Sequence, residues 1–149
     1  MKPFTLHAAL RYREQLETRA QQRLVEAEQI EARLILELRS AEKELNELYE
    51  GLHLSERQGV TVDRLILFNH RIDLVRDIVL AKRDDLEKQQ QQVAQRRQLL
   101  IKASRERKVI EKLREHQNAA YAKYLEKQEA IMLDETAVLG HERKRRNES

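Results

Sequence analysis

Residues 34–52 read LILELRSAEKELNELYEGL, and their apolar side chains repeat with gaps of four and three residues. The repeat falls on Leu34, Leu38, Ala41, Leu45, Leu48 and Leu52. Its mean period of about 3.5 residues is that of a left-handed coiled coil. The spacing extends back to the start of the chain, and eleven of its fourteen positions are apolar; the earlier ones are Leu6, Leu10, Arg13, Glu17, Ala20, Leu24, Ala27 and Glu31.

This repeat predicts a first helix over about residues 5–54, with Thr5 as its N-cap. A wider apolar face is expected beside the repeat, at Leu16, Val25, Ile30, Ile35 and Leu36. Gly51 and Gly59 indicate a connection over about residues 51–61. Thr61 then has the character of an N-cap, and Asp63 suits the positive end of a second helix.

The second helix is expected over about residues 62–139, followed by a basic tail over 140–149. Short connections usually join antiparallel neighbours. The prediction is therefore an all-α fold: one domain over residues 1–149, formed by a long antiparallel two-helix coiled-coil hairpin with a longer second helix. A parallel dimer with a flexible joint is the alternative.

Composition supports long exposed helices. The 149 residues include 3 Gly and 1 Pro, 37% are charged, 4% are aromatic, and there is no Trp. The absence of cysteine excludes disulfides and thiolate metal sites. No apolar run approaches the ~20 residues of a membrane span, and the first residues lack the apolar core of a signal peptide. We expect a soluble, cytoplasmic protein.

The second helix has its own apolar stripe, which Lys82, Gln89 and Arg96 interrupt; its members are Leu65, Phe68, Ile72, Val75, Val79, Leu86, Val93 and Leu100. After Ala103 a shifted register is expected, through Ile110, Leu113, Ala120, Tyr124, Ile131 and Val138. Folding at the connection pairs Leu6 with a position near residue 108. About thirty residues of the second helix then lack an intrachain partner, although they include Tyr121, Tyr124, Leu125, Ile131, Met132, Leu133, Val138 and Leu139.

A second stripe on this helix is formed by Leu67, Leu74, Ile78 and Ala81. It predicts either a partner-binding face or internal packing against the connection at residues 52–60. A two-stranded rod buries only one stripe of each helix, so both interpretations remain open here.

No pattern indicates catalysis, a cofactor or a metal site. The three glycines stand apart, so they form no phosphate-binding loop, and none of the five histidines has zinc-type spacing. Carboxylates on a rod lie in water, whereas general acid–base catalysis needs a shielded pocket. The run Arg143–Arg146 suits a solvated basic tail better than a nucleic-acid site, because four charges without interleaved aromatics are a weak pattern.

Residues 4–17 read FTLHAALRYREQLE, with an aromatic residue, two leucines, Arg and Glu in that order. This stretch resembles the opening of the flagellar FliJ family. Residues 105–115, RERKVIEKLRE, followed by Tyr121, Glu126 and Leu133-Asp134-Glu135, resemble its C-terminal half. Injectisome stalk proteins have a similar design.

The resemblance implies a non-enzymatic stalk of the type III export apparatus, peripherally associated with the inner face of the cell membrane. Its expected partners are the export ATPase hexamer, the cytoplasmic domain of the export-gate membrane protein and escort chaperones. The second stripe is then assigned to the gate, and the ATPase ring to Tyr121, Tyr124, Leu125, Ile131, Leu133 and Val138. A general coiled-coil scaffold, an injectisome stalk protein and a nucleic-acid-binding rod are the alternatives.

Overall fold

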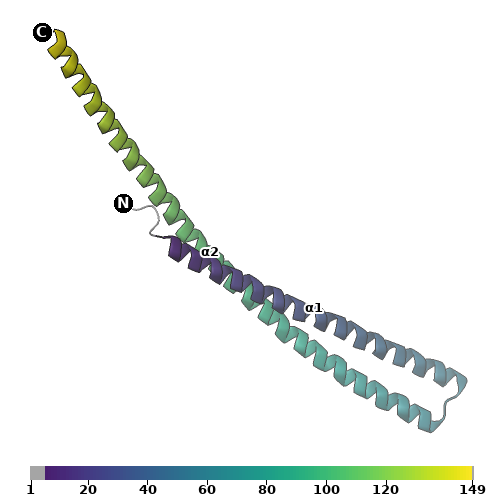
Figure 1. Cartoon of the computed structure of the whole chain (residues 1–149). Helices are drawn as coiled ribbons and strands as arrows, with labels where there is room; N and C mark the ends of the chain where they lie inside the picture. The colour runs from purple at the N-terminus through teal and green to yellow at the C-terminus, as the bar shows by residue number, and fades with distance from the viewer. Residues whose placement is uncertain (1–5, 149) are drawn as a thin grey trace. The chain divides into compact units, whose positions relative to one another are not determined.

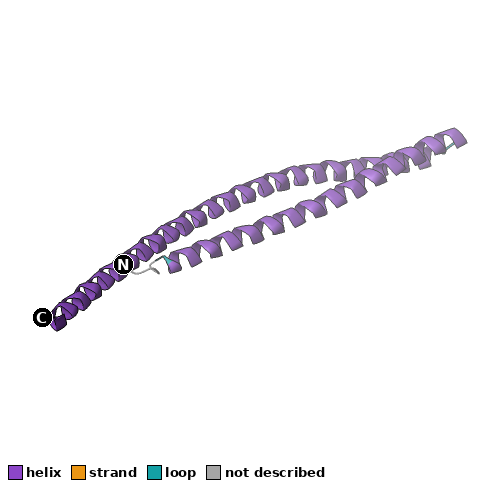
Figure 2. Ribbon diagram, turned by 90° about the horizontal axis from the view of Figure 1, so that it is seen from above, coloured by secondary structure: helices purple, strands orange, loops and turns teal. Residues whose placement is uncertain are grey.

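The computed structural model describes residues 6–148, and nearly all of them lie in two α-helices. Helix α1 spans His7–Gln58 and helix α2 spans Val62–Glu148 (Figure 1). Figure 2 shows helix along both elements and no strand in the described part of the chain. The predicted all-α class, with a longer second helix, is confirmed.

The chain divides into two compact units: residues 18–102, and residues 1–17 together with 103–149. Within the first unit, the contacts show that α1 and α2 run antiparallel. Arg71 Nη2 lies 2.5 Å from Glu44 Oε1, Lys82 Nζ lies 2.7 Å from Glu37 Oε2, and Gln89 Nε2 donates to the carbonyl of Ala27 at 3.0 Å. As the residue number on α2 rises from 71 to 89, the number of the contacting residue on α1 falls from 44 to 27. The hairpin is confirmed, and the parallel dimer is wrong.

The second unit has the same antiparallel pairing. Arg13 Nη1 lies 2.7 Å from Glu106 Oε2, and Arg107 Nε donates to Glu17 Oε2. Leu6 precedes Arg13 by two helical turns, so its position lies opposite about residue 113 rather than the expected 108. The difference arises because the connection is shorter than predicted.

All fourteen positions of the first repeat are buried or half-buried. The best-packed core lies in residues 18–102, where Ala41, Val75 and Val79 meet Leu38, Leu45 and Leu48. Val75 is 0% exposed. Of the flanking residues, Leu16 and Ile35 are half-buried. Val25, Ile30 and Leu36 are exposed, so the wider apolar face predicted for this helix is only partly present.

The predicted stripe of α2 is likewise buried or half-buried throughout, including the polar positions Lys82, Gln89 and Arg96. The predicted register shift after Ala103 is wrong for residues 103–121, where the register of the seam does not change. The spacing of three and four continues through half-buried Ala103, Arg107, Ile110, Arg114, Gln117 and Tyr121, whereas Leu113 and Ala120 are exposed. Charged and polar side chains hold the seam here, so following apolar residues alone gives the wrong register.

The connection is three residues long, not residues 51–61 as predicted. Helix α1 continues through Gly51 and ends at Gln58, and the next residue, Gly59, has a φ of 83°, the left-handed conformation that commonly follows a helix end. At Gly51 an added Cβ would lie 3.3 Å from Phe68 Cε1, so this glycine serves close helix packing rather than a break. Thr61 caps α2 as predicted, since its hydroxyl accepts the Arg64 amide at 3.3 Å. The predicted cap Thr5 lies outside the described residues.

Helix α2 continues to Glu148, so it is longer than the predicted range of residues 62–139, and the basic residues assigned to the tail are helical within the described range. We call residues 122–148 the terminal segment, and every one of them is exposed. The expectation that about thirty residues of α2 extend beyond the seam with α1 is therefore confirmed. Whether residues 1–149 fold as one domain stays a prediction.

Candidate partner-binding surfaces

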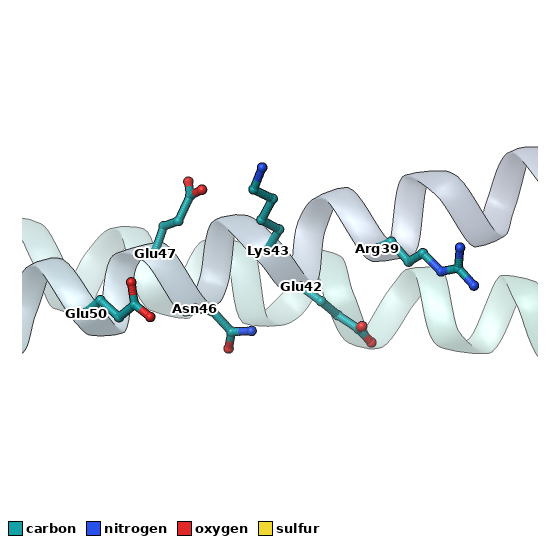
Figure 3. A pocket seen from close by; sticks show the side chains of 6 residues that line it. All are labelled: Arg39, Glu42, Lys43, Asn46, Glu47 and Glu50. Atoms are coloured by element: carbon teal, nitrogen blue, oxygen red, sulfur yellow. The ribbon is translucent and has the colours of Figure 1, made fainter.

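The side chains of the described residues form no enclosed chemical site. Between residues 6 and 148, no group of three His, Asp or Glu side chains is placed to hold a metal ion. One shallow depression is lined by Arg39, Glu42, Lys43, Asn46, Glu47 and Glu50. Figure 3 shows that all six come from α1, with Lys43 and Glu47 pointing to one side and Glu42 and Asn46 to the other, so they do not converge on a common point. The surfaces of interest are therefore the exposed faces of the helices.

The second stripe lies in residues 18–102 and is exposed. Leu67, Leu74, Ile78 and Ala81 all face solvent. The alternative of internal packing against the connection is therefore wrong, and these side chains are free for contact with another protein. Val62, Ile66 and Leu80 are also exposed, and they extend the apolar surface beyond the predicted four residues.

Cations on the inner flanks of α2 bond to α1. Besides Arg71 and Lys82, Arg76 Nη2 donates to the Tyr49 hydroxyl at 2.6 Å and Arg83 Nη2 lies 3.3 Å from Glu42 Oε1. The hydrogen bond from Lys82 lowers the pKa of Glu37, and the hydrogen bond to Tyr49 raises the pKa of Arg76. These four cations are thus directed at α1.

The terminal segment carries five of the six residues assigned to the ATPase ring, and Tyr121 lies directly before it. Tyr124, Leu125, Ile131, Leu133 and Val138 are exposed, whereas Tyr121 is half-buried at the end of the seam. The rings of Tyr121 and Tyr124 stack, with centroids 6.4 Å apart and planes at 27°. The other four are spread along one helix and form no pocket.

Apolar side chains surround α2 between residues 130 and 140, in what we call the apolar collar: Ala130, Ile131, Met132, Leu133, Ala137, Val138 and Leu139. Successive residues of a helix are turned by about 100°, so Ile131, Met132 and Leu133 point to three different sides. Val138 and Leu139 repeat the directions of Ile131 and Met132 two turns later. One neighbouring helix cannot cover such a surface.

Met132 and Leu139 of the collar, and Ile66 and Leu80 near the second stripe, were not among the predicted site residues. A sequence signal was present for both sets. Apolar neighbours recur every seven residues at 124–125, 131–132 and 138–139, and apolar pairs fourteen residues apart stand at 66–67 and 80–81. Both members were assigned only at 124–125, and one member of each other pair was overlooked.

Basic residues continue the helix beyond the collar. Arg143–Arg146 are helical and exposed, with Arg145 and Arg146 in the last turn. Cations there are favourable because the C-terminal end of a helix carries partial negative charge.

Within the described residues, two long antiparallel helices with exposed apolar surfaces and no enclosed site define a coiled-coil protein. The family model for the Flagellar FliJ protein matches residues 1–146, and the chain belongs to this family. It is accordingly a component of the flagellar export apparatus. Comparisons with curated proteins and with solved structures give no match. Among the described residues, no helix has the length and apolar character to cross a membrane.

Proposed function

We propose that this protein is the non-enzymatic central stalk of the flagellar export apparatus. In this role the terminal segment enters the export ATPase ring, and the second stripe contacts the cytoplasmic domain of the export-gate protein. Escort chaperones bind the same rod, which is held peripherally at the inner face of the cell membrane. Membership of the FliJ family supports a role in the flagellar export apparatus. The exposed apolar surfaces support the assignment of the terminal segment to the ATPase ring and of the second stripe to the export gate.

The apolar collar is the observation that carries the proposal. Seven apolar residues lie on several sides of a single helix, and all seven are exposed in the chain by itself. Water contact with so much apolar surface is unfavourable by about 25 cal/mol per Å². A ring of subunits covers a helix from all sides, whereas a single docked helix covers one.

A truncation tests the ATPase contact. Removing the residues after Tyr121 is expected to abolish co-sedimentation with the ATPase ring and any change in its hydrolysis rate. Removing only the residues after His141 is the matched control, because it deletes the basic end and retains the collar. Full binding by the shorter protein would exclude the stalk role of the terminal segment.

The gate contact is tested on the second stripe. Changing Leu67, Leu74 and Ile78 to Ser should weaken binding to the gate cytoplasmic domain while helix content is retained, since these side chains are exposed. Val25→Ser with Leu36→Ser is the control, because both residues are exposed apolar positions on α1. Equal binding by the triple variant and the control would place the gate contact elsewhere.

A further inference from the structure

The outward side of α2 combines apolar and acidic side chains at regular spacing. Leu67, Leu74 and Ala81 repeat every seven residues, Ile66 and Leu80 stand beside the first and the last of them, and all five are exposed. Asp63, His70, Asp77 and Asp84 form a parallel line with the same seven-residue period, in which three of the four members are acidic, and Asp73 lies beside Leu74. We call these residues together the outer face of α2. The residues of this outer face have the spacing of a coiled-coil seam, although α1 packs against the opposite side of α2.

Charge is sorted between the two sides of this helix. Arg71, Arg76, Lys82 and Arg83 are directed to Glu44, Tyr49, Glu37 and Glu42 of α1. Of the acids on the outer face, Asp84 lies 3.0 Å from Lys88 one turn away. No ion pair of the described structure joins Asp63, Asp73 or Asp77 to a cation, although the charges of Asp73 and Asp77 add to the Tyr49 hydrogen bond in raising the pKa of Arg76. The outer face is consequently apolar and acidic.

We propose that the outer face of α2 binds an amphipathic α-helix of a partner protein that carries an apolar stripe flanked by Lys or Arg. A helix presents apolar residues at the spacing of three and four that matches the pairs on α2. Basic side chains beside that stripe complement Asp73 and Asp77 and orient the partner. The inference rests on the proposed gate contact, because it uses the same stripe, and it adds the chemistry of the partner.

Other occupants fit less well. Anionic lipid head groups and nucleic-acid phosphates are repelled by a line of aspartates. An extended peptide alternates its side chains every two residues and does not reproduce a seven-residue repeat. A helix with acidic flanks matches the spacing but meets like charge.

The test uses the full chain and two designed three-heptad peptides, both with Leu at the seam positions. One has Lys at the flanking positions and the other has Glu. Fluorescence anisotropy should show binding of the lysine peptide at least about tenfold tighter than the glutamate peptide, with weaker binding at higher salt. Asp73→Lys with Asp77→Lys should reverse the preference. Leu74→Ser with Leu80→Ser should weaken binding of the preferred peptide about tenfold.

The matched control is Glu47→Lys with Glu50→Lys, which makes the same charge change on the exposed side of α1 (Figure 3). It should leave the lysine-peptide preference unchanged. Circular dichroism melts verify that each variant folds, and Asp73→Asn with Asp77→Asn replaces the lysine variant if that one fails to fold. A charge-swapped chain that still prefers the lysine peptide, or a control that loses the preference equally, overturns the inference.

Parallel binding of the gate cytoplasmic domain separates this inference from the proposed function. Gate binding without a lysine-peptide preference overturns the inference and leaves the proposed function standing. A lysine-peptide preference without gate binding supports the inference and removes the gate contact from the proposed function. Self-association of the chain that is lost in Asp73→Lys with Asp77→Lys would replace the partner helix by a second copy and overturn the inference.

Discussion

Glu17 of α1 and Arg107 of α2 form an ion pair across the seam, and their side chains are only 16% and 22% exposed. Arg107 also lies 2.7 Å from Glu111 one turn along α2. The hydrogen bond to Glu17 is the main cause that raises the pKa of this guanidinium. An ordinary coiled coil has apolar residues at seam positions. At this place in the seam, the two helices are instead joined by an ion pair.

Reversing one charge of this pair should lower the melting temperature. Glu17→Arg places two cations in the seam, and Arg107→Glu places two anions there. The double variant restores opposite charges but leaves the introduced carboxylate on α2 beside Glu111, so it should recover only part of the loss. Thermal melts followed by circular dichroism measure all three proteins. A double variant that melts below both single variants would show that the two side chains do not interact.

Burying a charge in the apolar part of the seam should be more damaging. Leu34 is 8% exposed and Leu36 is 66% exposed. Leu34→Asp loses about 1.5–3 kcal/mol of side-chain burial and adds the cost of a partly desolvated carboxylate. Leu36→Asp is the matched control and should change stability by less than about 0.5 kcal/mol. Urea unfolding measures both, and similar midpoints for the two variants would contradict the assigned seam. Leu45→Asp tests the same seam nearer the connection.

The ion pair of Glu37 and Lys82 predicts a pH dependence. The hydrogen bond from Lys82 lowers the pKa of Glu37 below its ordinary value of 4.5. A lowered pKa in the folded state means that the carboxylate stabilises the fold above the ordinary value, and that this contribution is lost as pH falls through the folded pKa. Glu37→Gln should therefore reduce the stability of the fold at neutral pH. Below about pH 4.5 this variant should lose less stability with falling pH than the parent protein does. Parallel stability curves for the two proteins from neutral to acidic pH would exclude this contribution.

The helix end at Gly59 predicts a glycine-specific effect. A φ of 83° is unfavourable for residues with a Cβ, so Gly59→Ala should destabilise the hairpin by about 1–2 kcal/mol. Gly140→Ala is the control, because it lies in a helix with no atom within 4 Å of the added Cβ. That change should retain or increase helix content. Equal melting temperatures for Gly59→Ala and the parent would show that the turn adapts without cost.

The hairpin was predictable because its strongest signal is local. Leu34, Ala41 and Leu48 belong to one repeat, and a chain with so few glycines and prolines has little else to interrupt a helix. The exact connection was not predictable in the same way. Gly51 and Gly59 are both glycines and look alike in the sequence. In the structure, Gly51 packs beside Phe68, whereas Gly59 has a positive φ. Only the paired helices distinguish a glycine required for close approach from one required for a turn.

The candidate surfaces were partly predictable for a related reason. Leu67 and Ile131 were identified because apolar residues outside a two-helix seam stand out in the sequence. The seam over residues 103–121 was misjudged because Arg107 lies inside it and Leu113 outside, the reverse of their hydropathies. The sorting of charge also needed the structure, since Arg76 and Asp77 are neighbours in sequence and face different surroundings.

The collar predicts how the proposed ring contact responds to substitution. A helix surrounded by apolar groups gains from many weak contacts, and a stalk that shifts between subunits is held in one state if any single contact is strong. Tyr124→Ala or Ile131→Ala should therefore weaken ring binding by only about two- to fivefold, which corresponds to roughly 0.4–1 kcal/mol. Ile131→Ser combined with Met132→Ser and Leu133→Ser changes three sides at once and should weaken it far more. Hairpin stability should stay constant in all of these variants, because the terminal segment is exposed throughout. Co-sedimentation with the ATPase at several protein concentrations gives the affinities, and circular dichroism melts give the stability. If Ile131→Ser alone removes binding while Met132→Ser and Leu133→Ser have no effect, the contact is one-sided, and a docked helix rather than an enclosing ring covers the collar.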